Sequence, residues 1–199
     1  MKRVLFPALA GALLAMTGAA LADTPVSAVT DLNVRAGPGP QYPVIGVLAA
    51  GQSATLNGCI EGSKWCTIAE ASGKGWVYSD YVTGDFGGSR VVVTRRPADA
   101  GIAVVAPPTD DLYSDSYTGA IVTSDPVEPI ARPPAEIGTY VTTHRVDPVY
   151  LDGEVVTGAV LPDSVELSEI PDYNYRYVYV NNQPALVDPG TRRIVYVMR

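Results

Sequence analysis

The chemically reactive side chains of this 199-residue chain are few: two cysteines and one histidine. Cys59 and Cys66 flank Gly62 and Ser63, a pair suited to a tight hairpin turn. A disulfide across that hairpin would stabilise a small domain by about 2.5 kcal/mol in the chain-entropy model. A metal site is the alternative, but it would need more Cys or His ligands, and His144 stands alone. The spacing favours a disulfide, with no metal and no cofactor.

The sequence holds no pattern typical of a catalytic site. A nucleophile needs a base within hydrogen-bond reach, yet both cysteines are expected to be bonded and the histidine has no partner in sequence. Neither Gly-x-Ser-x-Gly nor HExxH occurs. Two carboxylates could meet in a cleft as in glycosidases, but modules this small offer little cleft. We therefore predict that the protein is not an enzyme.

Residues 1–22 are typical of a secretory signal peptide. Lys2 and Arg3 precede an apolar run that ends at the small-x-small motif Ala20-Leu21-Ala22. An uncleaved membrane anchor is the alternative, but Thr17 and Gly18 interrupt the apolar run. Cleavage would deliver a periplasmic or secreted chain with no later membrane span. The two cysteines would then lie in an oxidising compartment.

The charge balance is acidic. The formal net charge is −7, and it becomes −9 when the signal removes Lys2 and Arg3 and no acidic residue. An acidic chain repels phosphate backbones and anionic membranes, so nucleic acid is not expected as a partner. A cationic surface or ligand would be a more favourable partner than an anionic one. The alternative is that the negative charge only keeps the protein soluble.

Composition divides the mature chain into three parts and predicts an all-β protein. Residues 23–84 contain short apolar runs such as Val44–Leu48 between Gly, Pro and Asn clusters, which indicates a small β-barrel or sandwich. Residues 85–138 are predicted to form a flexible, proline-rich linker with one possible strand at Arg90–Thr94. Strand signals return over residues 139–199, and no convincing helical period appears. The prolines of the middle part stand at positions 97, 107, 108, 126, 129, 133 and 134.

The end of the chain predicts a three-stranded meander. Alternation from Tyr175 to Val180 has the period of a strand, and Asn181-Asn182 can adopt the positive φ angles of a hairpin turn. Pro184–Val187 would form the returning strand. The turn Asp188-Pro189-Gly190-Thr191 would lead into the third strand, Arg192–Met198.

The first part resembles the bacterial Src homology 3 domain family. The segments that carry the resemblance are Leu32–Gly39, Tyr42–Gly51 and Gly73–Val82. In such a barrel Arg35 would end a strand and donate to carbonyls of the following turn. Trp76 would be a core or core-edge ring, and Trp65, beside the disulfide hairpin, would be partly exposed.

The last part resembles domain of unknown function 1236. The segments that carry this resemblance are Gly158–Leu167, Tyr175–Val180, Leu186–Pro189 and Thr191–Val197. The resemblance implies a short periplasmic or secreted bacterial protein, often with a Src-homology-3-like domain ahead of this unit. It implies no known chemistry.

Two functions follow as hypotheses. The first is an exported cell-envelope protein that binds peptidoglycan peptides or wall-associated proteins, with an aromatic groove of Tyr42, Trp65, Tyr78 and Tyr81 as its contact surface. Core packing is the alternative role of each ring. The second hypothesis is a protein-interaction module, in which Pro126-Val127-Glu128-Pro129 has the spacing of a proline-rich ligand but lacks an adjacent basic residue.

Overall fold

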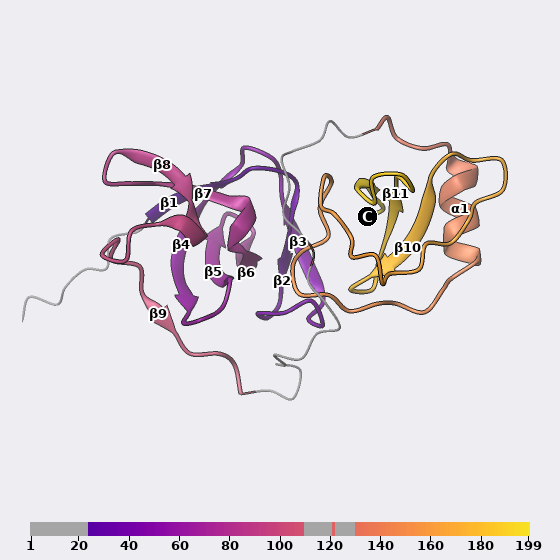
Figure 1. Ribbon diagram of the computed structural model, residues 1–199. Helices are drawn as coiled ribbons and strands as arrows, with labels where there is room; N and C mark the ends of the chain where they lie inside the picture. Colours follow the sequence, from indigo (N-terminus) through magenta and orange to yellow (C-terminus); the bar gives the residue numbers. More distant parts are fainter. Residues whose placement is uncertain (1–23, 110–120, 122–129) are drawn as a thin grey trace, which may run out of the picture.

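The computed structural model describes residues 24–109, 121 and 130–199. The predicted signal peptide and the Pro126-Val127-Glu128-Pro129 motif lie outside the described residues. Within the described part of the chain, no helix has the length and apolar character needed to cross a membrane. The described residues form two β-rich modules side by side (Figure 1).

The first module is one curled sheet in which β3 and β8 are the edges. Its strands follow the order β3-β2-β6-β5-β4-β1-β7-β8, and β9 pairs with β4. The first and last strands of this order do not pair, so the curled sheet is not closed, and the predicted SH3-like all-β fold is confirmed. The bounds are β1 Thr24–Ala28, β2 Leu32–Arg35, β3 Val44–Leu48, β4 Ser53–Ile60, β5 Trp65–Glu70, β6 Gly73–Tyr78, β7 Val82–Phe86, β8 Ser89–Val92 and β9 Val104–Val105, with 3-10 turns at Ser79–Tyr81 and Val93–Arg95.

The predicted disulfide is present and ties two adjacent strands. Cys59 of β4 and Cys66 of β5 are cross-strand partners with Cα atoms 4.0 Å apart. The turn between the strands contains Gly62 at a φ of +73°, a conformation that glycine adopts without steric cost. Both cysteines are buried in the core of the module, so the bond joins β4 to β5 where they pack.

Removing this bond should weaken the fold measurably. We expect the Cys59→Ala/Cys66→Ala double variant to lose about 2–3 kcal/mol of unfolding free energy in urea, because the unfolded chain is no longer cross-linked. A reductant should destabilise the wild type and leave the double variant unchanged. Two reactive thiols in the unfolded, unreduced wild type would contradict the assignment.

Strands of the first sheet lie within the predicted linker, residues 85–138. The end of β7, all of β8 and β9 lie after residue 84 and belong to the first sheet, because β7 and β8 form a hairpin and β9 runs parallel to β4. The possible strand at Arg90–Thr94 is instead Ser89–Val92 followed by a 3-10 turn. The β9 segment approaches β4 so closely that a Cβ on Gly58 would lie 2.8 Å from the Ala103 carbonyl oxygen. Glycine at this position is what allows the approach.

The C-terminal module is a three-stranded meander covered by one helix. The strands are β10 Arg176–Val180, β11 Gln183–Val187 and β12 Ile194–Val197, in that order in the sheet, and the predicted meander is confirmed. Asn181 and Asn182 have φ angles of 52° and 65°, as a tight turn between β10 and β11 requires.

The helix of this module was not expected from the sequence. α1 spans Ala135–Thr143 and straddles the predicted boundary at residue 138. Ile137, Tyr140 and Val141 are spaced to share one helix face, and they pack with meander side chains in one hydrophobic cluster. The Tyr179 hydroxyl donates to the Val141 carbonyl at 3.1 Å, which fastens α1 to β10.

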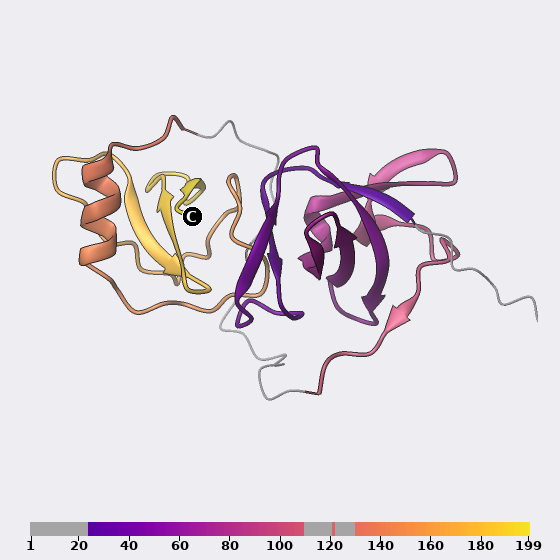
Figure 2. The ribbon, with the colours of Figure 1, turned by 180° about the vertical axis from the view of Figure 1, so that it is seen from behind.

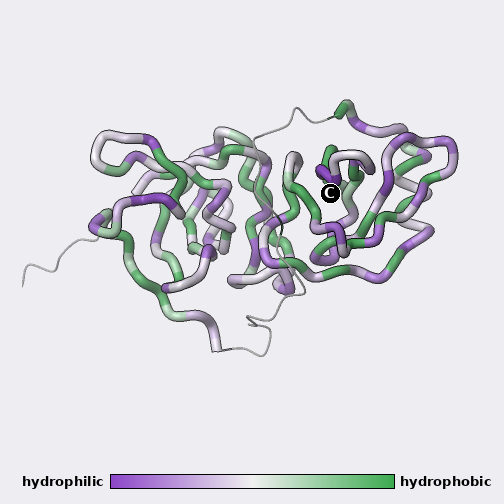
Figure 3. Tube along the Cα trace, in the orientation of Figure 1, coloured by the Kyte–Doolittle hydropathy of each residue, from purple (hydrophilic) through white to green (hydrophobic). Residues whose placement is uncertain are grey.

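The two modules are joined by a common core. One hydrophobic cluster runs from Leu32, Trp65 and Val77 of the first module to Val155 and Val180 of the second. The β2–β3 hairpin lies between the two modules when the protein is seen from the front (Figure 1) and from behind (Figure 2). Hydrophobic stretches of chain lie on both sides of this junction (Figure 3). The modules therefore form one packed unit.

Candidate functional site

Three of the four predicted contact rings are brought together. Trp65 stands on β5, Tyr78 ends β6 and Tyr81 closes the short 3-10 turn that follows it. The rings of Trp65 and Tyr78 meet edge-on with centroids 5.3 Å apart, and Tyr78 and Tyr81 lie 6.3 Å apart. We call these three residues the aromatic cluster.

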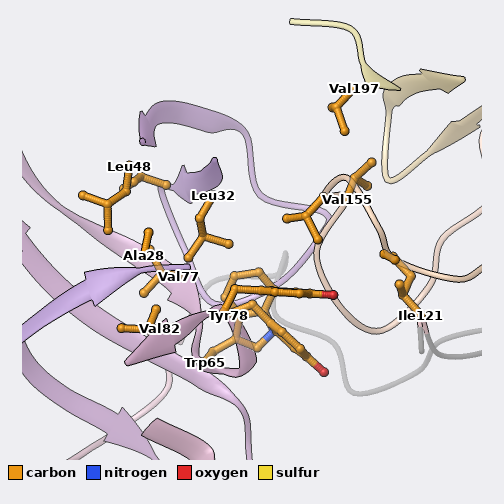
Figure 4. Packing of buried hydrophobic residues seen from close by; sticks show 14 of the residues in the cluster. Ala28, Leu32, Leu48, Trp65, Val77, Tyr78, Val82, Ile121, Val155 and Val197 are labelled. Carbon is orange, nitrogen blue, oxygen red and sulfur yellow. The ribbon is translucent and has the colours of Figure 1, made fainter. Parts of the chain in front are cut away.

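The aromatic cluster is closed, which corrects the expectation of an exposed groove. Trp65, predicted to be partly exposed, has only 3% of its surface accessible, and both tyrosines are buried. The hydrophobic core that contains them also contains residues of a segment that we call the covering segment, residues 149–156. Tyr78 and Trp65 lie on the side of the first module that faces Val155 and Ile121 (Figure 4). The covering segment of the C-terminal module thus shares a core with the aromatic cluster.

Polar contacts surround the closed cluster. Lys64 pairs with Asp80 at 2.8 Å, and its ammonium lies 5.5 Å from the centre of the Tyr78 ring. The Tyr78 hydroxyl donates to Asp152 of the covering segment across 3.5 Å. Burial raises the pKa of the Tyr78 phenol and also that of the Asp152 carboxyl, an effect that Lys64 offsets in part for the carboxyl. Both groups are held in a partly desolvated contact between the modules.

Asn181 fixes the covering segment to the meander. Its side-chain oxygen accepts from the Leu151 amide at 2.9 Å, and its side-chain nitrogen donates to the Leu151 and Gly153 carbonyls at 3.1 and 3.2 Å. The buried backbone of an irregular segment is thereby satisfied by one side chain. The sequence predicted the turn at Asn181 but not this second role.

A buried ion pair crosses the junction. The Arg35 guanidinium donates from Nε and Nη2 to the two oxygens of Glu154 at 2.6 and 2.7 Å, and the side chains are 1% and 0% exposed. Asn33 donates to Glu154 at 2.9 Å and to the Gln183 side-chain oxygen at 2.6 Å. We call these four residues the junction network. Such bidentate pairing is favourable at full burial because both oxygens of Glu154 and the facing Arg35 donors are hydrogen-bonded.

Arg35 has the local role that the sequence predicted and a distant role that it did not. Its Nη1 donates to the Pro40 and Tyr42 carbonyls at 3.0 and 2.8 Å, which confirms the expected bonds to the following turn. Glu154 lies 119 positions away. Its only sequence signal is one acidic residue beside the apolar pair Val155-Val156.

Tyr42, the fourth predicted ring, lies apart from the aromatic cluster. It is buried but is not part of the shared core. Its ring occupies the space in which a Cβ of Gly37 would stand, 2.2 Å from the ring carbons. This packing fixes the conformation of the loop between β2 and β3.

A crevice of about 480 Å³ opens beside Tyr42, between the modules. We call it the intermodule crevice. One wall comes from the loop that precedes β3, and the other comes from the β10–β11 turn and the end of the chain. Its lining residues are Arg35, Pro40, Gln41, Tyr42, Pro43, Val44, Asn181, Asn182, Gln183, Pro184 and Met198.

The described residues offer no evident metal centre. No group of three or more His, Cys, Asp or Glu side chains lies close enough to hold an ion within residues 24–109, 121 and 130–199. His144 ends α1 and stacks on Tyr140, with ring centroids 4.1 Å apart.

Comparisons with known proteins identify both modules. Residues 30–83 match the bacterial SH3 domain family, and residues 140–199 match the family described as "Domain of unknown function (DUF1236)". The chain therefore carries a bacterial SH3 domain followed by a DUF1236 domain, in the order that the sequence resemblances predict.

One curated relative adds a link to a named activity. The "Putative N-acetylmuramoyl-L-alanine amidase YrvJ" of Bacillus subtilis (strain 168) is 43% identical over 79 residues, which are 40% of this chain. The chain matches only 15% of the length of that protein. No solved structure matches the chain.

Proposed function

We propose that this protein is an exported, non-catalytic binding protein of the cell envelope that contacts peptidoglycan peptides or wall-associated proteins. The observation that carries the proposal is the bacterial SH3 domain at residues 30–83. The relative from Bacillus subtilis supports it, because that protein is named a putative N-acetylmuramoyl-L-alanine amidase. The Cys59–Cys66 disulfide supports export, since such bonds persist in oxidising compartments.

The covered aromatic cluster changes where binding is proposed to occur. With Trp65, Tyr78 and Tyr81 buried, no open ring face of that cluster is offered to a ligand. Opening it would expose the apolar side chains of the shared core to water, which costs free energy in proportion to the apolar area uncovered. Binding at surfaces that are already open is therefore energetically favoured.

A retention assay tests this function. We expect the chain from Asp23 to be retained on protein-free peptidoglycan sacculi about tenfold more than on immobilised glycan strands from which an amidase has removed the peptides, a difference of about 1.4 kcal/mol. Retention should persist at about 1 M salt, where screening leaves little long-range electrostatic attraction.

The other outcomes separate the alternatives. Retention only on sacculi that still carry their proteins would favour a wall-associated protein as the partner. An unbound protein on all three preparations would refute the proposal.

A further inference from the structure

The intermodule crevice has rigid apolar walls from both modules. Two prolines and Val44 come from the SH3 domain, and Pro184 and Met198 come from the DUF1236 domain. Proline rings have fixed backbone angles, so a ligand that packs on them orders little new structure. The crevice exists only while the modules are docked, and the junction network holds them in that position.

Two amide side chains give the crevice its polar character. The Asn182 oxygen already accepts from the Tyr150 hydroxyl at 3.1 Å, and the Gln183 oxygen accepts from Asn33 at 2.6 Å. What each of these side chains can still offer a ligand is its NH₂ group. A fitting ligand must therefore supply acceptors, and carbonyl oxygens are the natural choice.

The crevice carries no uncompensated charge. Arg35 is the one charged residue in its lining, and the Glu154 carboxylate neutralises it through two hydrogen bonds. An ionic ligand would lose hydration on entry and gain no opposite charge in return. The ligand segment inside the crevice should be uncharged.

We infer that the intermodule crevice binds a short, extended and uncharged peptide segment with small side chains. Its carbonyl oxygens would accept from Asn182 and Gln183, and its apolar side chains would pack on the proline and Met198 walls. The volume of about 480 Å³ lies in the range of ligand sites and suits a few residues rather than a folded domain. This inference rests on the proposed function and names the ligand and its place.

A glycan strand fits the crevice less well than a peptide does. Sugar rings pack best on the exposed flat face of an aromatic side chain, and Tyr42, the aromatic residue of this lining, is buried under Gly37. Peptide carbonyls, in contrast, meet the two amide donors directly.

The site can be located by NMR on the whole mature chain. We would titrate ¹⁵N-labelled protein with an uncharged Ala-Ala-Ala peptide blocked at both ends, and in parallel with glycan strands from which the peptides have been removed. The largest shifts should appear at the backbone amides of Gln41, Tyr42 and Val44 together with Asn182 and Gln183, and only with the peptide. Shifts confined to one module, or equal shifts with glycan strands, would overturn the inference.

Variants of the lining provide the second test. Asn182→Gly removes one donor and suits the positive φ angle, and we expect it to weaken peptide binding about five- to tenfold with little change in melting temperature. Met198→Ala should weaken binding to a similar degree by removing an apolar wall. Ser53→Ala, in a separate surface hollow beside Pro25, is the matched control and should bind normally.

The outcomes distinguish this inference from the proposed function. Retention on sacculi combined with unchanged affinity of both lining variants would refute the crevice and leave the function standing. Loss of sacculus retention by the wild type would refute both.

Discussion

Replacing Glu154 by alanine should lower the free energy of unfolding by about 3–5 kcal/mol, because the Arg35 guanidinium would remain buried without its counter-charge. Asn33 would lose one acceptor at the same time. A loss of this size is a large fraction of the stability of a domain. Urea denaturation followed by circular dichroism would measure it.

Matched variants show whether burial causes the effect. Glu169→Ala removes the acid of an exposed pair with Arg176, and it should change the stability by less than about 1 kcal/mol. The double variant Arg35→Ala/Glu154→Ala should lose less than the sum of the two single losses, because neither charge is then left alone. A Glu154→Ala protein as stable as the Glu169→Ala protein would show that the junction is open in solution.

Local features were predicted well because short-range physics determines them. Alternation of Tyr and Val predicted β10, and the tolerance of asparagine for positive φ angles predicted the turn at Asn181-Asn182. The hydrogen bonds from Arg35 to nearby carbonyls span only five and seven residues. Each of these interactions lies within one hairpin or loop.

Features that depend on distant contacts were missed. The proline-rich composition of residues 85–138 predicted a linker, yet β9 within it is held by pairing with β4, more than 40 positions away. α1 is a short helix whose stability comes from packing on the meander. Nothing in the sequence distinguishes Glu154 from other acidic residues. It becomes the buried partner of Arg35 only where the two modules pack together.

The aromatic residues show the same limit in the site. In an isolated SH3-like module, Trp65 beside a hairpin was expected to be partly exposed and Trp76 to be in the core or at its edge. The covering segment alters the first expectation, since Trp65 is buried and Trp76 is the half-buried ring at the edge of the core. A ring that seemed available for binding is part of the contact between modules.

Replacing Trp65 by alanine should therefore cost about 3–5 kcal/mol of unfolding free energy, the usual loss for a large ring in a closed core. Trp76→Ala should cost less, about 1–3 kcal/mol, because that ring is only half buried. Urea unfolding of both variants, followed by circular dichroism, would rank them. The sequence alone had predicted the opposite order.

Trp65→Phe separates the packing of the ring from its polar group. The Trp65 Nε1–H is buried without a hydrogen-bond acceptor in the described part of the protein. Removing that donor loses no bond, so Trp65→Phe should retain most of the stability that Trp65→Ala loses. If Trp65→Ala cost under about 1 kcal/mol while Trp76→Ala cost more, the aromatic cluster would be open in solution. The SH3 groove would then be available to a wall ligand, and the DUF1236 domain would not be its permanent cover.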